Sequence, residues 1–314
     1  MSLRLLPACF VFLMTILLLS VPAAAADWSV PRDFATIQAA INSPSVAEGD
    51  RILVGPGSFA GALVTKSLHI QGVGRAVIAT GPLHPAGLVQ GFRLFDGSDG
   101  TTISHLRFEV DLPVINATSH QVDNVTVTQN TLVSPVQGIS NWLGSGWEIT
   151  QNEIVDLRTR CGGGIAILVG DYAGGVVSDN IVSHNRITGT VRVSAGDCGG
   201  YNATGIVIYA DYRFGRLGST QIAFNRVVKN HIALTSDTPS VVDVVAVELT
   251  EAGDPDPLTH VIHDNAVGFN DLRGTTLQLA LTPVDLDAPT NDISRNLGEN
   301  RGHGLHPAAF VGSD

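Results

Sequence analysis

From residue 49 onward, hydrophobic positions alternate with polar ones in short runs, each bounded by glycine or proline. The segments "RILVGPGSFAGALV" and "SLHIQGVG" are examples, and this alternation predicts short β-strands. Residues 33–43 differ, because four hydrophobic residues recur there at helical spacing: Phe34, Ile37, Ala40 and Ile41. Asp33 occupies the position of an N-cap, so we expect one short amphipathic helix.

A longer repeat begins near residue 100. Several segments share one frame, an alternating strand followed by an asparagine; these are Asn130, Asn152, Asn185, Asn225 and Asn265. A second family of strands interleaves with the first, among them "GIAILVGDY", "GIVIYADY" and "DVVAVELTE". Such repeats must stack to bury a hydrophobic face, which predicts a parallel coil. We expect the asparagines to form one structural ladder, because each amide can bond its equivalent one strand spacing (~4.8 Å) away.

The first 26 residues follow the pattern of a secretory signal peptide: one positive charge (Arg4), an apolar stretch and a run of alanines. A retained membrane anchor is the alternative, but Pro22 interrupts the apolar stretch just before the alanines. Cleavage after Ala26 predicts a protein that is secreted, periplasmic or on the cell surface. We expect no membrane contact after cleavage, because no other apolar run is long enough to span a bilayer.

The charge balance argues against one class of partner. The formal net charge is −11, which becomes −12 when Arg4 is removed, and Lys66 and Lys229 are the two lysines. We therefore expect no nucleic-acid partner. The same charge favours neutral over acidic glycans, because an acidic polymer would be repelled at long range.

Two cysteines remain after the signal peptide, Cys161 and Cys198. An even pair in an exported chain predicts a disulfide between them. A metal pair and two free thiols are the alternatives.

Residues 33–74, from "DFATIQAAI" to "KSLHIQGVG", together with the asparagine-bearing repeats, resemble the right-handed parallel β-helix superfamily, the pectin-lyase-like fold. The resemblance covers most of residues 33–300. It implies an all-β, single-stranded right-handed parallel β-helix (a solenoid) whose open end is capped by an N-terminal α-helix at about 33–43. We therefore divide the chain into a signal peptide (1–26), a β-helix domain (27–300) and a C-terminal tail (301–314).

The resemblance implies a fold but not an activity, because this fold carries lyases, hydrolases, esterases, epimerases and adhesins. The "DFIFG"-like segment of pectin methylesterases and the Asp-Pro-His-Asp of alginate epimerases are absent. A Gly-His-Gly stands at residues 302–304, without the other polygalacturonase motifs. Whether the protein is an enzyme therefore stays open at this point.

A doubled phrase marks the best candidate site, because it ends in Asp171-Tyr172 and again in Asp211-Tyr212. On successive coils the two carboxylates would lie close together, which would give an acid and a base for glycosidic chemistry. We expect Arg213 to act with them by pairing with an acidic group, and the two tyrosines to hold a sugar ring. The copies are one residue out of step, so one aspartate could point away. The simpler interpretation is that both pairs begin loops.

Four acidic residues follow in the same strand family: Glu248, Glu251, Asp254 and Asp256. In one interpretation Glu248 and Glu251 extend the substrate-binding groove; in another the group binds Ca²⁺ through oxygen ligands. We expect no other metal or cofactor. The sequence thus predicts an exported protein that binds or processes polysaccharide by hydrolase-like or lyase-like chemistry. A non-catalytic surface solenoid for adhesion or scaffolding is the alternative.

Overall fold

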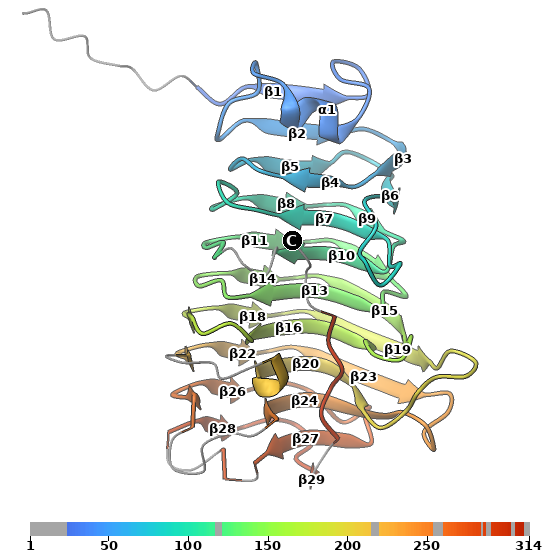
Figure 1. The fold of residues 1–314 in the computed structure, drawn as a ribbon, viewed down its shortest axis with the longest axis vertical. Coiled ribbons are helices and arrows are strands. Elements are labelled where there is room, and N and C mark those ends of the chain that lie inside the picture. The colour runs from blue at the N-terminus through green and yellow to red at the C-terminus, as the bar shows by residue number, and fades with distance from the viewer. Residues whose placement is uncertain are drawn as a thin grey trace, which may run out of the picture.

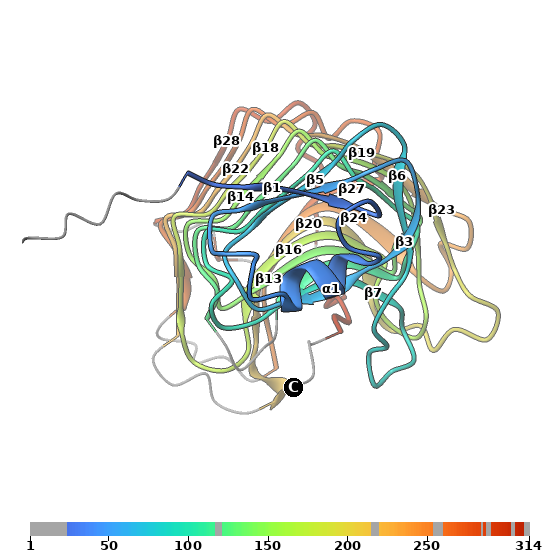
Figure 2. The same ribbon diagram turned by 90° about the horizontal axis from the view of Figure 1, so that it is seen from above.

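The chain forms a coil of parallel β-strands. The computed structural model describes residues 24–116, 121–214, 220–253, 260–283, 285–286, 290–302 and 305–310. Strands one coil apart lie side by side, so the same faces repeat down the molecule (Figure 1). Seen from the N-terminal end, successive coils stack around one interior (Figure 2). The fold is therefore an all-β parallel β-helix.

Within the described residues, three long sheets and one short sheet line the coil. The ten-stranded sheet runs in the order β1 (Asp27–Val30), β2 (Arg51–Val54), β5 (His69–Gly72), β8 (Thr102–Ser104), β11 (Thr126–Thr128), β14 (Glu148–Thr150), β18 (Ile181–Ser183), β22 (Arg226–Val228), β26 (Ala266–Gly268) and β28 (Asp292–Ser294). The seven-stranded sheet holds β3 (Gly57–Ala60), β6 (Ala76–Thr80), β9 (Arg107–Phe108), β12 (Thr131–Val133), β15 (Glu153–Arg158), β19 (Arg186–Arg192) and β23 (His231–Ser236).

The nine-stranded sheet carries the candidate site. It holds β4 (Ala62–Val64), β7 (Gln90–Leu94), β10 (Leu112–Asn116), β13 (Gln137–Trp142), β16 (Ile165–Asp171), β20 (Asn202–Asp211), β24 (Asp243–Ala252), β27 (Leu277–Thr282) and β29 (Arg301–Gly302). A three-stranded sheet follows it in the lower coils, with β17 (Val176–Ser178), β21 (Gln221–Ala223) and β25 (Ile262–His263).

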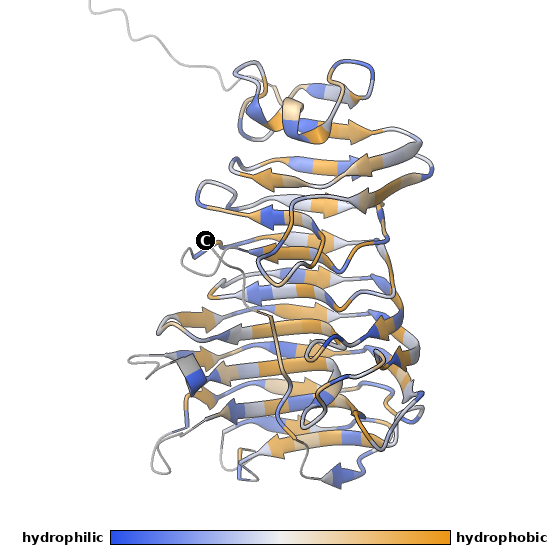
Figure 3. Ribbon diagram, turned by 45° about the vertical axis from the view of Figure 1, so that its right-hand side comes forward, coloured by the Kyte–Doolittle hydropathy of each residue, from blue (hydrophilic) through white to orange (hydrophobic). Residues whose placement is uncertain are grey.

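Alternation along each strand places one set of side chains inside the coil. In the ten-stranded sheet one column of aligned, buried residues runs through the core: Ile52, Ile70, Ile103, Val127, Ile149, Val182, Val227, Val267 and Ile293. All are β-branched, which suits a pleated strand packed above and below by its like. Burying one such side chain contributes roughly 1.5–3 kcal/mol. Figure 3 shows hydrophobic positions recurring on successive coils.

The buried asparagines form two ladders instead of the single predicted one. The first joins Asn130, Asn152, Asn185, Asn230, Asn270 and Asn296; the second joins Asn141, Asn180, Asn225, Asn265 and Asn291. The prediction of one ladder is wrong because each coil turns at two separate corners. Asn185 therefore bonds Asn230, at 3.0 Å, and not Asn225.

The residue before each asparagine of the first ladder turns the chain. Gln129, Gln151, His184 and Lys229 all have left-handed backbone angles, with φ of 57°, 57°, 56° and 59°. This conformation is unfavourable for residues other than glycine. The ladder supports it, because each asparagine oxygen accepts both the side-chain and the backbone N–H of the asparagine one coil earlier.

A short helix, α1 (Ile37–Asn42), lies at the N-terminal end of the coil (Figure 2). Its buried residues belong to the hydrophobic core: Ile37, Ala40 and Ile41. The N-cap is Thr36, whose hydroxyl accepts a backbone N–H at 3.0 Å, and not Asp33 as the sequence indicated. Asp33 instead accepts the backbone N–H of Ser29, which lies in β1. The role of the helix as a cap stays a prediction.

Cys161 and Cys198 form the predicted disulfide, with 4.8 Å between their Cα atoms. It joins the loops that follow β15 and β19, which are neighbours in the seven-stranded sheet. Asp197 holds the same loops, because its carboxylate accepts from Thr159 Oγ1 at 2.8 Å and from the Cys161 N–H at 3.0 Å. Burial alone would raise the pKa of Asp197, but its hydrogen bonds, first that from Tyr201, hold the pKa at about 2.

The predicted signal peptide lies largely outside the described residues, which begin at residue 24. Among the residues that are described, no helix is long and apolar enough to cross a membrane.

Candidate functional site

A second hydrophobic cluster, separate from the core, lies on the outer face of the nine-stranded sheet. We call it the outer-face cluster; its buried members are Leu88, Leu112, Ile115, Val136, Trp142, Ile165, Leu168, Val207, Tyr209 and Ala252. Side chains that point away from a coil normally meet solvent and are polar. A buried hydrophobic outer face therefore needs a cover.

The cover is the C-terminal strap, which we define as residues 305–310. It runs along the coil axis across the outside of the nine-stranded sheet (Figure 1). Ala309 and Phe310 pack on the outer-face cluster. Hydrogen bonds join the strap to four positions: Thr250 Oγ1 with His306 Nδ1 (2.9 Å), Tyr209 OH to Pro307 O (3.2 Å), Gly163 N to Ala308 O (2.7 Å), and Gln137 with the Phe310 backbone (2.8 and 2.9 Å).

Aligned side chains on neighbouring strands build the face beneath the strap. One row holds Leu168, Val207 and Glu248, and the next holds Trp142, Gly170, Tyr209 and Thr250. Gly170 lies between Trp142 and Tyr209 in this row and lets their two rings approach each other. A side chain does not fit there, since a Cβ at this position would lie 2.4 Å from the carbonyl oxygen of Tyr209. The Trp142 and Tyr209 ring centroids are 6.0 Å apart.

Tyr172 extends this aromatic group at the edge of the face. Its ring packs edge-on against Trp142 at 5.5 Å and remains partly exposed. Trp142 itself is fully buried, and its indole N–H has no hydrogen-bond partner among the described residues. Tyr172, predicted to hold a sugar ring, therefore lies beside a larger ring that the sequence interpretation missed.

Glu248 is a fully buried acid on the same face. Burial raises the pKa of Glu248 to about 8, although hydrogen bonds from Asn202 Nδ2 (2.6 Å) and Thr204 Oγ1 (3.0 Å) favour the charged form. The carboxyl group is therefore mainly protonated at pH 7. Its Oε1 and the side-chain oxygen of Asn202 have no hydrogen-bond partner in the described part of the chain.

Asp211 lies further along β20, and both of its carboxylate oxygens accept hydrogen bonds. Its carboxylate accepts from Arg213 Nε at 2.8 Å, from Arg213 Nη2 at 2.7 Å and from Tyr209 OH at 2.9 Å. The hydrogen bond from Arg213 to Asp211 raises the pKa of the guanidinium, and burial raises the pKa of the Tyr209 hydroxyl. This pair thus anchors the far end of the face.

Asp171 and Asp211 do not form the stacked pair that the doubled phrase offered. The strands align Asp171 with Ala210, so Asp211 stands one residue further and belongs to the opposite set of alternating side chains. Asp171 is buried and accepts the backbone N–H groups of Ala173 and Gly175, each at 2.7 Å. Its carboxylate thus begins a loop, as in the simpler interpretation.

Glu251 repeats this arrangement on the next coil. It shares the row of Asp171 and Ala210, and it accepts the backbone N–H groups of Val261 and Ile262 at 2.8 and 3.0 Å. Glu251 and Glu248 therefore bind different partners. Asp254 and Asp256, the other proposed Ca²⁺ ligands, lie outside the described residues.

The described part of the chain contains no group of three or more His, Cys, Asp or Glu side chains arranged to hold a metal ion. Ca²⁺ binding stays a prediction.

Tyr212 lies in a short 3₁₀ turn, η1 (Tyr212–Phe214), and packs partly buried against the core. It does not share the outer-face cluster with Tyr172. The site residues that the sequence interpretation missed are Gln137, Trp142, Asn202 and Tyr209. Tyr209 could have been found, because it alternates with Asp211 and so faces the same side of the strand.

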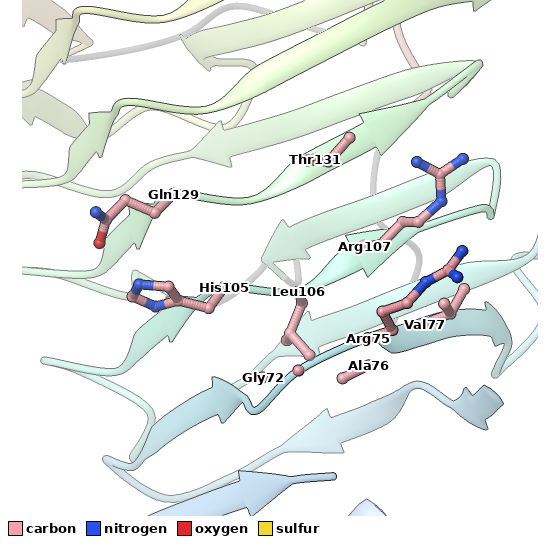
Figure 4. Close-up of a pocket in the computed structure, with 10 residues that line it drawn as sticks. Gly72, Arg75, Ala76, Val77, His105, Leu106, Arg107, Gln129 and Thr131 are labelled. Atoms are coloured by element: carbon pink, nitrogen blue, oxygen red, sulfur yellow. The ribbon is translucent and has the colours of Figure 1, made fainter. Parts of the chain in front are cut away.

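A shallow hollow of about 350 Å³ lies elsewhere, on the outside of the upper coils (Figure 4). His105, Arg107 and Gln129 are among its lining residues; His105 and Arg107 extend from one coil and Gln129 from the next. Arg107 is paired with Glu109 at 2.7 Å. This hollow lacks the aromatic rings and buried polar atoms that distinguish the outer face of the nine-stranded sheet.

No protein-family model matches the chain. No curated protein matches it. Among solved structures, the chain is similar to the catalytic domain of a GH87 alpha-1,3-glucanase in complex with nigerose, with 12% identity, a TM-score of 0.35, and coverage of 91% of this chain and 69% of that one. A variant of such a domain in complex with tetrasaccharides gives 12% identity, a TM-score of 0.36, and coverage of 93% and 68%. A likeness this remote assigns no activity to the chain.

Proposed function

We propose that this protein binds polysaccharide on the outer face of the nine-stranded sheet. The observation that carries the proposal is the combination, on one face of the coil, of aromatic rings and buried polar atoms that have no partner among the residues the structure describes. Trp142, Tyr172 and Tyr209 supply the rings, and Asn202 and Glu248 supply the polar atoms.

This chemistry suits a sugar chain. A pyranose ring offers an apolar C–H face that stacks on aromatic rings, and a rim of hydroxyl groups that pair with amides and carboxyls. Buried polar atoms are costly when unpaired, so the face gains when a ligand brings hydroxyl groups to Glu248 Oε1 and Asn202 Oδ1. Because Glu248 is neutral at pH 7 and the chain is acidic, a neutral glycan fits better than an acidic one.

Binding is better supported than cleavage. Two carboxyl groups about 5–10 Å apart are needed to flank a glycosidic bond. Asp171 is held by its own loop and Asp211 by Arg213, and Glu248 is aligned with Val207, four residues from Asp211 along β20. We therefore propose a binding protein first, and place hydrolase or lyase activity and the catalytic roles of Asp171, Asp211 and Arg213 second.

The finer fold assignments belong to the same proposal. We infer a right-handed coil of the pectin-lyase-like superfamily, because strand connections between parallel neighbours are almost always right-handed. Export is supported by the N-terminal sequence and by the disulfide, which is typical of oxidising compartments. The buried face of α1 supports its role as a cap.

The test is a binding screen of residues 27–314 against neutral and acidic polysaccharides, with and without Ca²⁺. The informative variant is Trp142→Phe, which keeps an aromatic ring but removes the indole N–H, a donor with no acceptor in the described part of the chain. We expect it to weaken binding about tenfold, as for a central aromatic contact. Release of reducing ends or unsaturated products in the same samples measures cleavage, and Glu248→Gln then tests the buried acid.

The matched control is Trp147→Phe, a second buried tryptophan whose ring belongs to the core and whose indole N–H donates to Val122 O at 2.7 Å. It lowers stability without touching the outer face, so binding by the folded fraction should be unchanged. Equal binding losses in both variants would contradict the site. A folded protein that binds nothing in the screen would overturn the proposal in favour of a scaffold.

A further inference from the structure

We propose that the C-terminal strap, residues 305–310, is a built-in occupant of the polysaccharide site and that a glycan must displace it to bind. This inference rests on the proposed function and adds the regulation of that same site.

The strap is an irregular segment, without helix or strand, in which every residue from 305 to 310 keeps part of its surface exposed except Pro307. It is attached mainly through its own backbone: the carbonyl groups of Pro307, Ala308 and Phe310 and the N–H of Phe310 all bond to the body of the coil. Backbone groups of this kind do not depend on a particular strap sequence. They resemble the contacts that a bound chain of another chemistry would make.

The strap occupies groups that a sugar chain would use. The amide nitrogen of Gln137 donates to Phe310 O at 2.9 Å, and its amide oxygen accepts the Phe310 N–H at 2.8 Å. The Tyr209 hydroxyl shares its single proton between Asp211 at 2.9 Å and Pro307 O at 3.2 Å, and Thr250 bonds His306. Tyr209 and Thr250 lie in the row that also carries Trp142, and Gln137 lies in the row of Ile165 and Thr204.

Other buried polar groups of the same outer face are not satisfied by the strap. Glu248 Oε1, Asn202 Oδ1 and the indole N–H of Trp142 are buried and have no partner among the described residues. A segment that had evolved only to complete the fold would be expected to pair such groups. The strap packs on the apolar residues of the face but does not pair with these polar groups. It therefore acts as a substitute for the ligand.

Phe310 is the main apolar anchor of the strap. Its ring packs on the outer-face cluster and meets His84 edge-on, with ring centroids 6.2 Å apart. Leu305, at the other end of the strap, is 56% exposed. The two residues therefore offer a test in which one apolar side chain of the strap holds it down and the other does not.

The experiment compares polysaccharide affinity in residues 27–314, in a chain ending at Gly302, and in the full-length variants Phe310→Ala and Leu305→Ala. If the strap covers the site part of the time, the apparent Kd equals the intrinsic Kd divided by the fraction of molecules in which the site is open. We expect about tenfold or greater tightening on truncation, a smaller tightening for Phe310→Ala and no change for Leu305→Ala. A synthetic peptide LHPAAF should compete with the glycan for the truncated chain, and a scrambled peptide should not.

Opening is also measured without ligand. Acrylamide quenching of Trp142 in a Trp28→Phe, Trp147→Phe background, and hydrogen exchange of the backbone amide at position 310 in full-length chains, should both rise in Phe310→Ala and not in Leu305→Ala. This keeps the proposal open to refutation if the truncated chain fails to fold.

The outcomes separate the two proposals. Equal affinity in every chain, or weaker binding after truncation, would overturn the inference about the strap; polysaccharide binding itself would stand, but at groups other than the buried Trp142, Tyr209 and Glu248. Absence of binding in every folded chain would overturn the proposed function, and the inference with it.

Discussion

At the scale of single residues, Glu248 is the group whose charge is most constrained by its surroundings. Its pKa is about 8 in the folded chain, against 4.5 without the protein environment, because burial removes the carboxylate from water. As pH rises, the unfolded chain loses this proton first. The contribution of the protonated Glu248 carboxyl group to the free energy of unfolding is therefore complete below about pH 4.5, and it is lost as the pH rises to about 8.

We predict that Glu248→Gln removes this pH dependence. Each pKa unit of difference corresponds to about 1.4 kcal/mol, so the variant should exceed the natural protein in stability by a few kcal/mol at pH 9 and not at pH 4.5. Urea unfolding midpoints at pH 4.5, 7 and 9 measure the effect. The control is Glu153→Gln, an exposed position on β15. Profiles for Glu248→Gln and the natural protein that run parallel would contradict the assignment.

Sequence predicted the residue types of the site better than their arrangement. It singled out Glu248, Tyr172 and Arg213, which lie on or beside the outer face. It could not establish whether Asp171 and Asp211 share a face, because a shift of one residue in strand register moves a side chain to the opposite face. Trp142 was missed because its strand differs in sequence from the doubled phrase, although it is aligned with Tyr209 through Gly170.

At the scale of the element, the asparagine ladders determine where each coil turns. Asn185 is central in the first ladder: its oxygen accepts two N–H groups from Asn152, and its amide donates to Ile149 O and Asn230 Oδ1. Removing this side chain leaves those buried groups without partners. Each such loss costs about 1–3 kcal/mol.

We predict that Asn185→Ala destabilises the chain by about 3 kcal/mol or more, because several buried groups lose a partner together. Denaturant unfolding of the variant measures the loss. Asn42→Ala is the matched control, since Asn42 lies exposed at the end of α1 and should change stability by less than about 0.5 kcal/mol. Similar losses at the two positions would mean that the ladder contributes little.

The repeat pattern predicted that asparagines stack, because a parallel coil brings equivalent positions to within one strand spacing. It did not predict two ladders. The second corner is formed by Asn141, Asn180 and Asn291 along with the predicted Asn225 and Asn265, and its members follow no single spacing. Loops of different length between the coils hide this regularity in the sequence.

At the scale of the whole molecule, a parallel coil is held together mainly by contacts between neighbouring coils. This is why the fold could be predicted: alternation, repeat length and glycine-bounded strands are local features, and stacking follows from them. The C-terminal strap could not be predicted in the same way. Its contact between Phe310 and Gln137 joins positions 173 residues apart, and nothing in the repeat marks the partner.

The strap connects coils that are not neighbours, from Thr250 on β24 to Gln137 on β13. Nearest-neighbour coils can unfold piecewise, whereas a link across several coils makes them unfold together. We therefore predict that a chain ending at Gly302 unfolds over a broader denaturant range, with a lower apparent m-value and a calorimetric enthalpy that exceeds the van't Hoff enthalpy. Phe310→Ala should show the same change in part and Leu305→Ala should show none. A truncated chain that loses stability while its transition stays as sharp as before would show that the strap adds contacts without coupling the coils.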